Sequence, residues 1–143
     1  MNINTYQPQR GDLVFLPWGG QTLHVEVTSD QHGEDRHGQR YLEARVVTPT
    51  DQLPAGQPID VRLADFEPDT EIVTLRWSPQ DHNGAEALRV NGVEVAVVMG
   101  DGWYMLHPEG EWGDEEDEEG KAAAQAAVLR FGAAKAAKAA KAS

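Results

Sequence analysis

A chain of 143 residues, 40% hydrophobic and 25% charged, can form one compact domain or two small ones and is too apolar to be wholly disordered. It has no apolar run of the roughly 18 residues that a membrane-spanning helix needs, and no signal peptide is expected at its start. Cysteine is absent, which excludes disulfides and thiolate metal sites, so we expect a soluble, cytoplasmic protein.

The net charge of −12 is divided unevenly along the chain. Residues 1–119 hold all 24 carboxylates and seven arginines, a net charge of −17. Residues 120–143 hold four lysines and one arginine without any acid, a net charge of +5. Such an asymmetry is typical of an interaction segment, and it equally fits a soluble surface followed by a solvated tail.

The first 68 residues contain short apolar stretches separated by glycine- and proline-rich turns. We expect strands at Leu13–Leu16, Thr22–Thr28, Tyr41–Thr48 and Ile59–Leu63, because apolar residues there form a short run or alternate with polar ones. The polar segment Ser29–Arg40 is expected to be a loop. Short strands at close spacing predict a small barrel or a strongly bent sheet.

The order of these stretches resembles that of a known fold. RGDLVFLPW, followed by TLHVEV, YLEARVV and PIDVRLADFEP, resembles the strand order of SH3-like barrels over residues 1–68. The resemblance implies a small barrel of a kind that binds peptides, nucleic acids or other proteins, so it narrows the function little.

The second part of the chain predicts a sheet followed by a helix. A strand is expected at Thr70–Trp77 and another at Trp103–Leu106, and Asn91-Gly92 lies between two apolar stretches as a strong hairpin signal. From Lys121 the composition favours a helix, with Ala124, Ala127, Val128 and Phe131 on one face and Gly132 as a C-terminal cap.

Residues 87–131 are similar to the three-stranded-sheet-plus-helix modules of phage integrase arms and of many uncharacterised phage proteins. This resemblance implies a phage or mobile-element origin. In the integrase modules basic residues of the sheet contact DNA, whereas here Glu94 and Asp101 accompany a single Arg89, which argues against DNA binding by this sheet.

The predicted fold class is therefore α+β, dominated by antiparallel strands. We expect an SH3-like or irregular small barrel at residues 1–68, and a three-stranded sheet packed by one C-terminal helix within residues 69–132. An Ala/Lys-rich tail follows at residues 133–143.

Catalytic and metal-binding patterns are weak. His32 and His37 flank a polar loop, but their spacing matches no regular helix or strand face, so a solvated loop is favoured over a metal site. Asp81-His82-Asn83 lies near Ser78 without the strand–nucleophile–helix turn of a hydrolase, which favours a loop. We therefore expect a protein that is not an enzyme and that uses no cofactor or metal.

Aromatic and acidic residues are the better candidates for a binding site. The expected site combines three aromatic residues with four carboxylates of the acidic run: Trp103, Tyr104, Trp112, Glu115, Glu116, Glu118 and Glu119. An aromatic anchor beside dense carboxylates suits a basic protein partner, including one whose groove normally binds nucleic acid. The run from Glu109 to Glu119 could also be a solvated linker or the start of the helix.

The tail supplies an alternative function. Lys135, Lys138 and Lys141 are three residues apart in an alanine-rich segment, so a nucleic-acid-associated protein that binds through this tail is the competing hypothesis. A membrane partner is not expected, and the oligomeric state is open.

Overall fold

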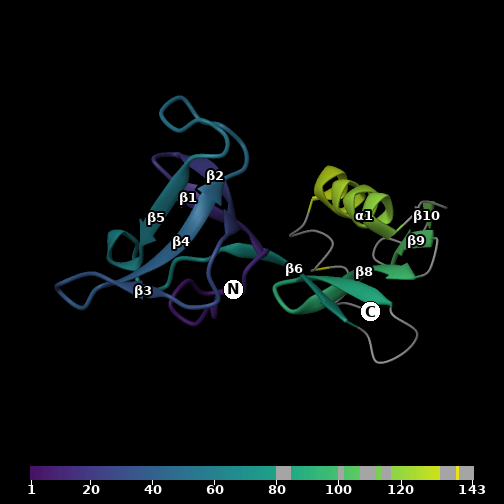
Figure 1. Cartoon of the computed structure of the whole chain (residues 1–143), viewed down its shortest axis with the longest axis horizontal. Coiled ribbons are helices and arrows are strands. Elements are labelled where there is room, and N and C mark those ends of the chain that lie inside the picture. Colours follow the sequence, from purple (N-terminus) through teal and green to yellow (C-terminus); the bar gives the residue numbers. More distant parts are fainter. Residues whose placement is uncertain (80–84, 100–101, 107–111, 114–116, 133–137, 139–143) are drawn as a thin grey trace. The chain divides into compact units, whose positions relative to one another are not determined.

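The computed structural model describes residues 1–79, 85–99, 102–106, 112–113, 117–132 and 138 (Figure 1). The chain forms two compact units, unit 1 at Met1–Thr74 and unit 2 at Leu75–Ser143. The predicted division lay six residues earlier, between residues 68 and 69.

Unit 1 consists of short antiparallel strands. These are β1 (Leu13–Trp18), β2 (Gln21–Val27), β3 (Gly33–Glu34), β4 (Arg40–Val46) and β5 (Pro58–Arg62), followed by the 3-10 helix η1 (Leu63–Asp65). β1 pairs with β2, and β4 pairs with β2, β3 and β5. These pairings within unit 1, every residue of which is described, form an open meander and do not close into a barrel.

The apolar alternation of the sequence becomes the core of unit 1. The fully covered side chains of β2 and β4 are those on the predicted apolar faces, and the N-terminal segment adds Ile3 and Tyr6, each 2% exposed. The core cluster comprises Ile3, Tyr6, Val14, Leu16, Leu23, Val25, Val27, Leu42, Ala44, Val61, Leu63 and Ile72. This core forms because successive side chains of a strand point to opposite faces, and apolar and polar residues alternate along the sequence in the same way.

A buried carboxylate holds the N-terminal segment of unit 1 in place. Asp12 is 2% exposed, accepts a hydrogen bond from the Tyr6 hydroxyl at 2.5 Å, and accepts a second from the Gln9 backbone N–H at 3.2 Å. These bonds replace the water that the carboxylate loses on burial. The turn at Arg10-Gly11-Asp12 therefore also ties the chain before β1 to the core.

Two predictions in unit 1 were wrong in detail. The segment Ser29–Arg40, predicted as a loop, contains β3, whose Gly33 pairs with Tyr41 in β4. Strand β1 continues through Pro17, where the prediction ended it. A proline fits at the end of a strand, because a missing N–H there costs the ladder little.

Unit 2 is a sheet covered by one helix. Its strands are β6 (Val73–Pro79, which begins at the end of unit 1), β7 (Glu86–Val90), β8 (Val93–Met99), β9 (Gly102–Met105) and β10 (Trp112–Gly113), and its helix is α1 (Asp117–Phe131). Each strand pairs antiparallel with the next. Within the described residues of unit 2, the three-stranded sheet predicted here extends to five strands, because β6 and β10 pair with its two edges.

The hairpin and the helix follow the sequence signals. Asn91 and Gly92 join β7 to β8 with φ of 51° and 82°, the left-handed geometry that this dipeptide tolerates. Helix α1 packs on β8 and β9, as Figure 1 shows, with Ala124, Ala127 and Val128 at most 2% exposed. Phe131 belongs to α1, but its side chain lies outside the described part of the chain.

The end of α1 is also as predicted. Gly132 adopts φ of 105° and its N–H donates to the Val128 carbonyl at 3.0 Å, which caps the helix. The α+β class with mostly antiparallel strands and one C-terminal helix is thus confirmed. No helix within the described residues is both long and apolar enough to span a membrane.

Candidate functional site

The predicted aromatic anchors lie at the β9–β10 edge of unit 2. Trp103 and Tyr104 are neighbours on β9, and β10 pairs with β9 so that Trp112 stands opposite Tyr104. Successive residues of a strand point to opposite faces, so Trp103 and Tyr104 do not share a surface. Trp103 is 8% exposed, whereas Tyr104 is half-buried, so Tyr104 is the one with surface for a partner.

The acidic run is divided by the start of the helix. Glu118 and Glu119 belong to the first turn of α1, which begins at Asp117, so this end of the acidic run is the start of the helix, one of the alternatives that the sequence left open. Carboxylates in this turn favourably oppose the positive end of the helix dipole. Glu115 and Glu116 lie outside the described residues.

Of the three tail lysines, Lys138 is described and exposed, while Lys135 and Lys141 lie outside the described residues. The loop Asp81-His82-Asn83, weighed above for acid–base chemistry, lies outside them as well. Within the described residues, no group of three or more His, Asp and Glu side chains is placed to hold a metal ion.

The helix-covered face of unit 2 carries a charged and aromatic contact at the start of α1. The Lys121 ammonium forms an ion pair with Glu86 and lies 5.7 Å from the centroid of the Trp77 ring. Trp77 also donates its indole N–H to Gln125 at 3.3 Å. These contacts give Trp77 a structural role.

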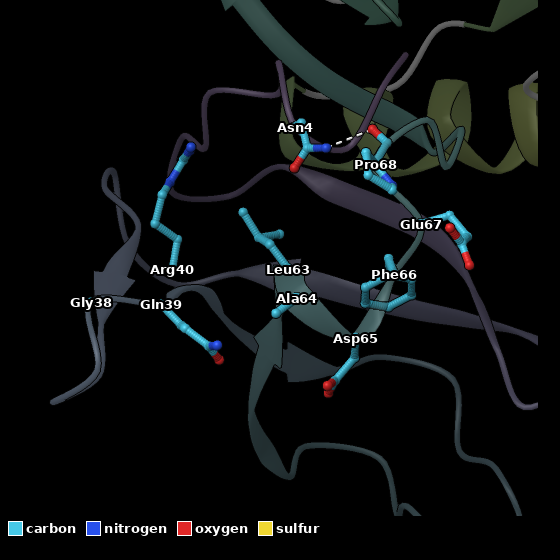
Figure 2. A pocket seen from close by; sticks show the side chains of 10 residues that line it. All are labelled: Asn4, Gly38, Gln39, Arg40, Leu63, Ala64, Asp65, Phe66, Glu67 and Pro68. Atoms are coloured by element: carbon cyan, nitrogen blue, oxygen red, sulfur yellow. Dashed lines mark hydrogen bonds between the residues drawn. The ribbon is translucent and has the colours of Figure 1, made fainter.

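Unit 1 contains an open pocket that the sequence did not predict. It measures about 630 Å³ and lies between the N-terminal segment, the start of β4 and the segment from η1 onward. Figure 2 shows Leu63 and Ala64 between Arg40 on one side and Phe66 on the other. The lining residues are Asn4, Gly38, Gln39, Arg40, Leu63, Ala64, Asp65, Phe66, Glu67 and Pro68.

The polar groups of this pocket are partly engaged. The Arg40 guanidinium donates to Nδ1 of His32 at 2.8 Å, and Asn4 donates its side-chain N–H to the Pro68 carbonyl at 2.6 Å (Figure 2). Burial, and secondarily the charge of Arg40, hold the pKa of His32 below its ordinary value of 6.5. A neutral His32 can accept this bond at Nδ1, which fixes the position of Arg40 at the pocket wall.

A smaller pocket of about 140 Å³ opens where the β1–β2 turn meets the β4–β5 loop. Trp18, Gly19 and Gln21 line it from the turn, and Thr50, Asp51 and Gln52 line it from the loop. We call it the Trp18 pocket. The sequence feature at this pocket is Trp18 beside two glycines, and such a tryptophan can equally be a core residue or an interface residue.

A buried histidine lies on the β1–β2 sheet of unit 1. His24 is 8% exposed, stacks on Phe15 with ring centroids 4.1 Å apart, and lies 3.2 Å from the Thr48 hydroxyl through Nδ1. Its Nε2 is buried with no hydrogen-bond partner among the described residues. Desolvation lowers the pKa of His24 from its ordinary value of 6.5.

Comparison with known proteins gives no family model, no curated protein and no solved structure that matches this chain.

Proposed function

We propose that this chain is a non-catalytic binding protein that recognises a basic protein partner through the β9–β10 edge of unit 2. The observation that supports it is the pairing of β10 with β9, which sets Trp112 opposite Tyr104 at the end of the sheet. Residues opposite each other in an antiparallel pair are neighbours, and Trp and Tyr are frequent interface anchors.

The contact proposed here is narrower than the sequence suggested. Tyr104 and Trp112 act as the aromatic anchor, and Trp103 is left to the core because it is 8% exposed. Glu115 and Glu116 supply long-range attraction for the partner, while Glu118 and Glu119 lie in the first turn of α1 and also stabilise the helix. The net charge of −17 over residues 1–119 favours encounter with a cationic surface.

We further propose that unit 1 has an SH3-like arrangement and that the protein is phage- or mobile-element-encoded and acts in the cytoplasm. The succession of short antiparallel strands β1, β2, β4 and β5 supports the first part. The origin rests on the resemblance of residues 87–131 to phage modules. Through its acidic surface the protein would act as an accessory or inhibitor, occupying a groove made for nucleic acid.

The test is kinetic. The partner is isolated from the source cells by affinity capture on the full chain, and both rate constants are measured for purified variants. Glu115→Gln with Glu116→Gln should slow association and flatten its salt dependence, whereas Trp112→Ala and Tyr104→Ala should speed dissociation about tenfold or more.

A second pair of substitutions, Glu118→Gln with Glu119→Gln, removes the same charge within α1. It should lower the thermal stability of unit 2 as well as the association rate, because the helix loses favourable charges in its first turn. Unchanged rates in every folded variant would sink the proposal and leave the acidic run as a solvated linker.

A further inference from the structure

We infer that the Trp18 pocket of unit 1 binds an arginine side chain presented by a partner protein. This contact surface lies in unit 1 and is separate from the β9–β10 edge, so it goes beyond the proposed function. The pocket holds about 140 Å³, enough for one long side chain and too little for a nucleotide or a folded element.

The aromatic wall of the pocket is fixed in position. Trp18 is half-buried and packs against the core of unit 1, and its ring contacts that of Phe66 at a centroid distance of 6.5 Å and an angle of 45°. A tryptophan face is the best aromatic partner for a cation, and a ring held in place loses little entropy when a ligand stacks on it.

A carboxylate on an ordered turn also lines the pocket. The Thr50 hydroxyl accepts hydrogen bonds from the backbone N–H groups of Gln52 at 3.3 Å and Leu53 at 3.1 Å, and the Thr50 N–H donates to the Leu53 carbonyl at 2.8 Å. Asp51 lies within this turn, is exposed, and has no ion pair or hydrogen bond among the described residues. Its two oxygens are therefore free to accept.

These groups fit arginine better than other cations. The planar guanidinium stacks on an aromatic face and donates two parallel hydrogen bonds to one carboxylate, whereas a lysine ammonium is a hydrated point charge. The side-chain oxygens of Gln21 and Gln52, which also line the pocket, can accept from the remaining N–H groups. Unit 1 carries twelve carboxylates and five arginines, a net charge of −7 that attracts such a ligand.

The surroundings indicate that the arginine belongs to a protein segment. Phe66, which contacts Trp18, also lines the 630 Å³ pocket of Figure 2, so the two pockets are linked through one aromatic pair. Asp65 and Glu67 line that second pocket together with apolar Leu63 and Ala64. The residues of the partner that flank the arginine can therefore lie along this second pocket, the 630 Å³ pocket of Figure 2.

The test is a titration of the full chain with a blocked Gly-Arg-Gly peptide. Binding is monitored by ¹H–¹⁵N NMR at the Trp18 indole N–H and at the amides of Gln21 and Gln52. A saturable shift at these groups is expected, with a Kd of about 1 mM for so small a probe. The same peptide with citrulline, which keeps the shape without the charge, should bind about tenfold or more weakly, and a lysine peptide should fall between them.

Two carboxylate variants provide the matched comparison. Asp51→Asn should weaken binding about tenfold, whereas Asp60→Asn, which removes an exposed charge of β5 that does not line the pocket, should change it less than twofold. Equal binding of the citrulline peptide, equal effects of the two variants, or no saturable shift would each overturn the inference. Trp112→Ala should leave peptide binding unchanged, so this inference and the proposed function can fail independently.

Discussion

At the scale of single residues, two positions in unit 1 have surroundings with measurable consequences. His24 loses water on the sheet of β1 and β2, and Gly33 lies beneath the ring of Tyr41. Each supports a prediction about stability rather than about binding.

The burial of His24 should make unit 1 less stable in mild acid. Because desolvation lowers the pKa of His24 in the folded state, the unfolded chain binds a proton more readily as the pH falls below the ordinary value of 6.5. The part of the folding stability that depends on a neutral His24 is therefore complete above pH 6.5. It is lost as the pH falls from 6.5 toward the lowered pKa of the folded state. Denaturant unfolding between pH 7.5 and pH 5 should show this loss.

The control for this prediction is a pair of substitutions. His24→Gln should reduce the pH dependence of the unfolding free energy and leave the part that comes from His32, whose pKa burial also lowers, and His24→Gln with His32→Gln should reduce it further. Identical pH profiles for the wild type and His24→Gln would show that this histidine does not drive the effect.

Gly33→Ala should destabilise the wild type more than a variant in which Tyr41 is truncated. A Cβ at Gly33 would lie 2.2 Å from Cζ of Tyr41, its partner across the β3–β4 pair, so the ring has to move away. Gly33→Ala should therefore cost about 1 kcal/mol in the wild type. In the Tyr41→Ala background the same change should be neutral or stabilising, because alanine restricts the unfolded chain.

A double-mutant cycle measured by denaturant unfolding gives the coupling energy directly. A coupling near zero would mean that the two residues do not meet in solution.

At the scale of elements, helix α1 depends on its buried stripe. Trp77, Leu88, Ala96 and Met105 are cross-strand neighbours in one row of the sheet, and the bond from Trp77 to Gln125 places α1 over that row. Leu88 and Ala96 are fully buried beneath it. Such a short, alanine-rich helix is marginal alone, so packing supplies most of its stability.

Val128→Asp should therefore unfold unit 2. Val128 is 0% exposed, and a carboxylate placed there has no partner, which should cost about 3 kcal/mol or more. Ala126→Asp puts the same charge on the exposed side of the same helix and should change stability by less than about 0.5 kcal/mol. Thermal melting followed by near-ultraviolet circular dichroism distinguishes them, and wild-type melting of Val128→Asp would refute the docking.

At the scale of the whole molecule, the distribution of charge bears on the two binding hypotheses. The acidic body of −17 repels a polyanion, whereas the segment of +5 attracts one. Lys138, the one tail lysine that is described, is exposed.

We expect the full chain to bind nucleic acid weakly. If Lys135, Lys138 and Lys141 each contact one phosphate, the log–log slope of affinity against salt should be about −3, and removal of residues 133–143 should abolish binding. Fluorescence anisotropy with labelled duplex DNA at several salt concentrations measures both quantities. Micromolar or tighter binding by the full chain would favour the nucleic-acid hypothesis over the proposed basic protein partner.

The sequence by itself determined those features of this protein that depend on residues close together in the chain. Alternation fixed the buried faces of β2 and β4, Asn91-Gly92 fixed the hairpin, and the i, i+3, i+4 spacing fixed the buried stripe of α1. Each signal is a period or a φ preference of a few adjacent residues, so it can be read without knowing the partners.

Only the tertiary structure decided which distant residues meet. The contact of Trp18 with Phe66 and the meeting of the β1–β2 turn with the β4–β5 loop around Asp51 join segments far apart in the sequence. They depend on strand register and on where loops close, and no local pattern specifies either. For the same reason the Trp18 pocket had no sequence signal beyond its tryptophan, although the burial of the core could be predicted strand by strand.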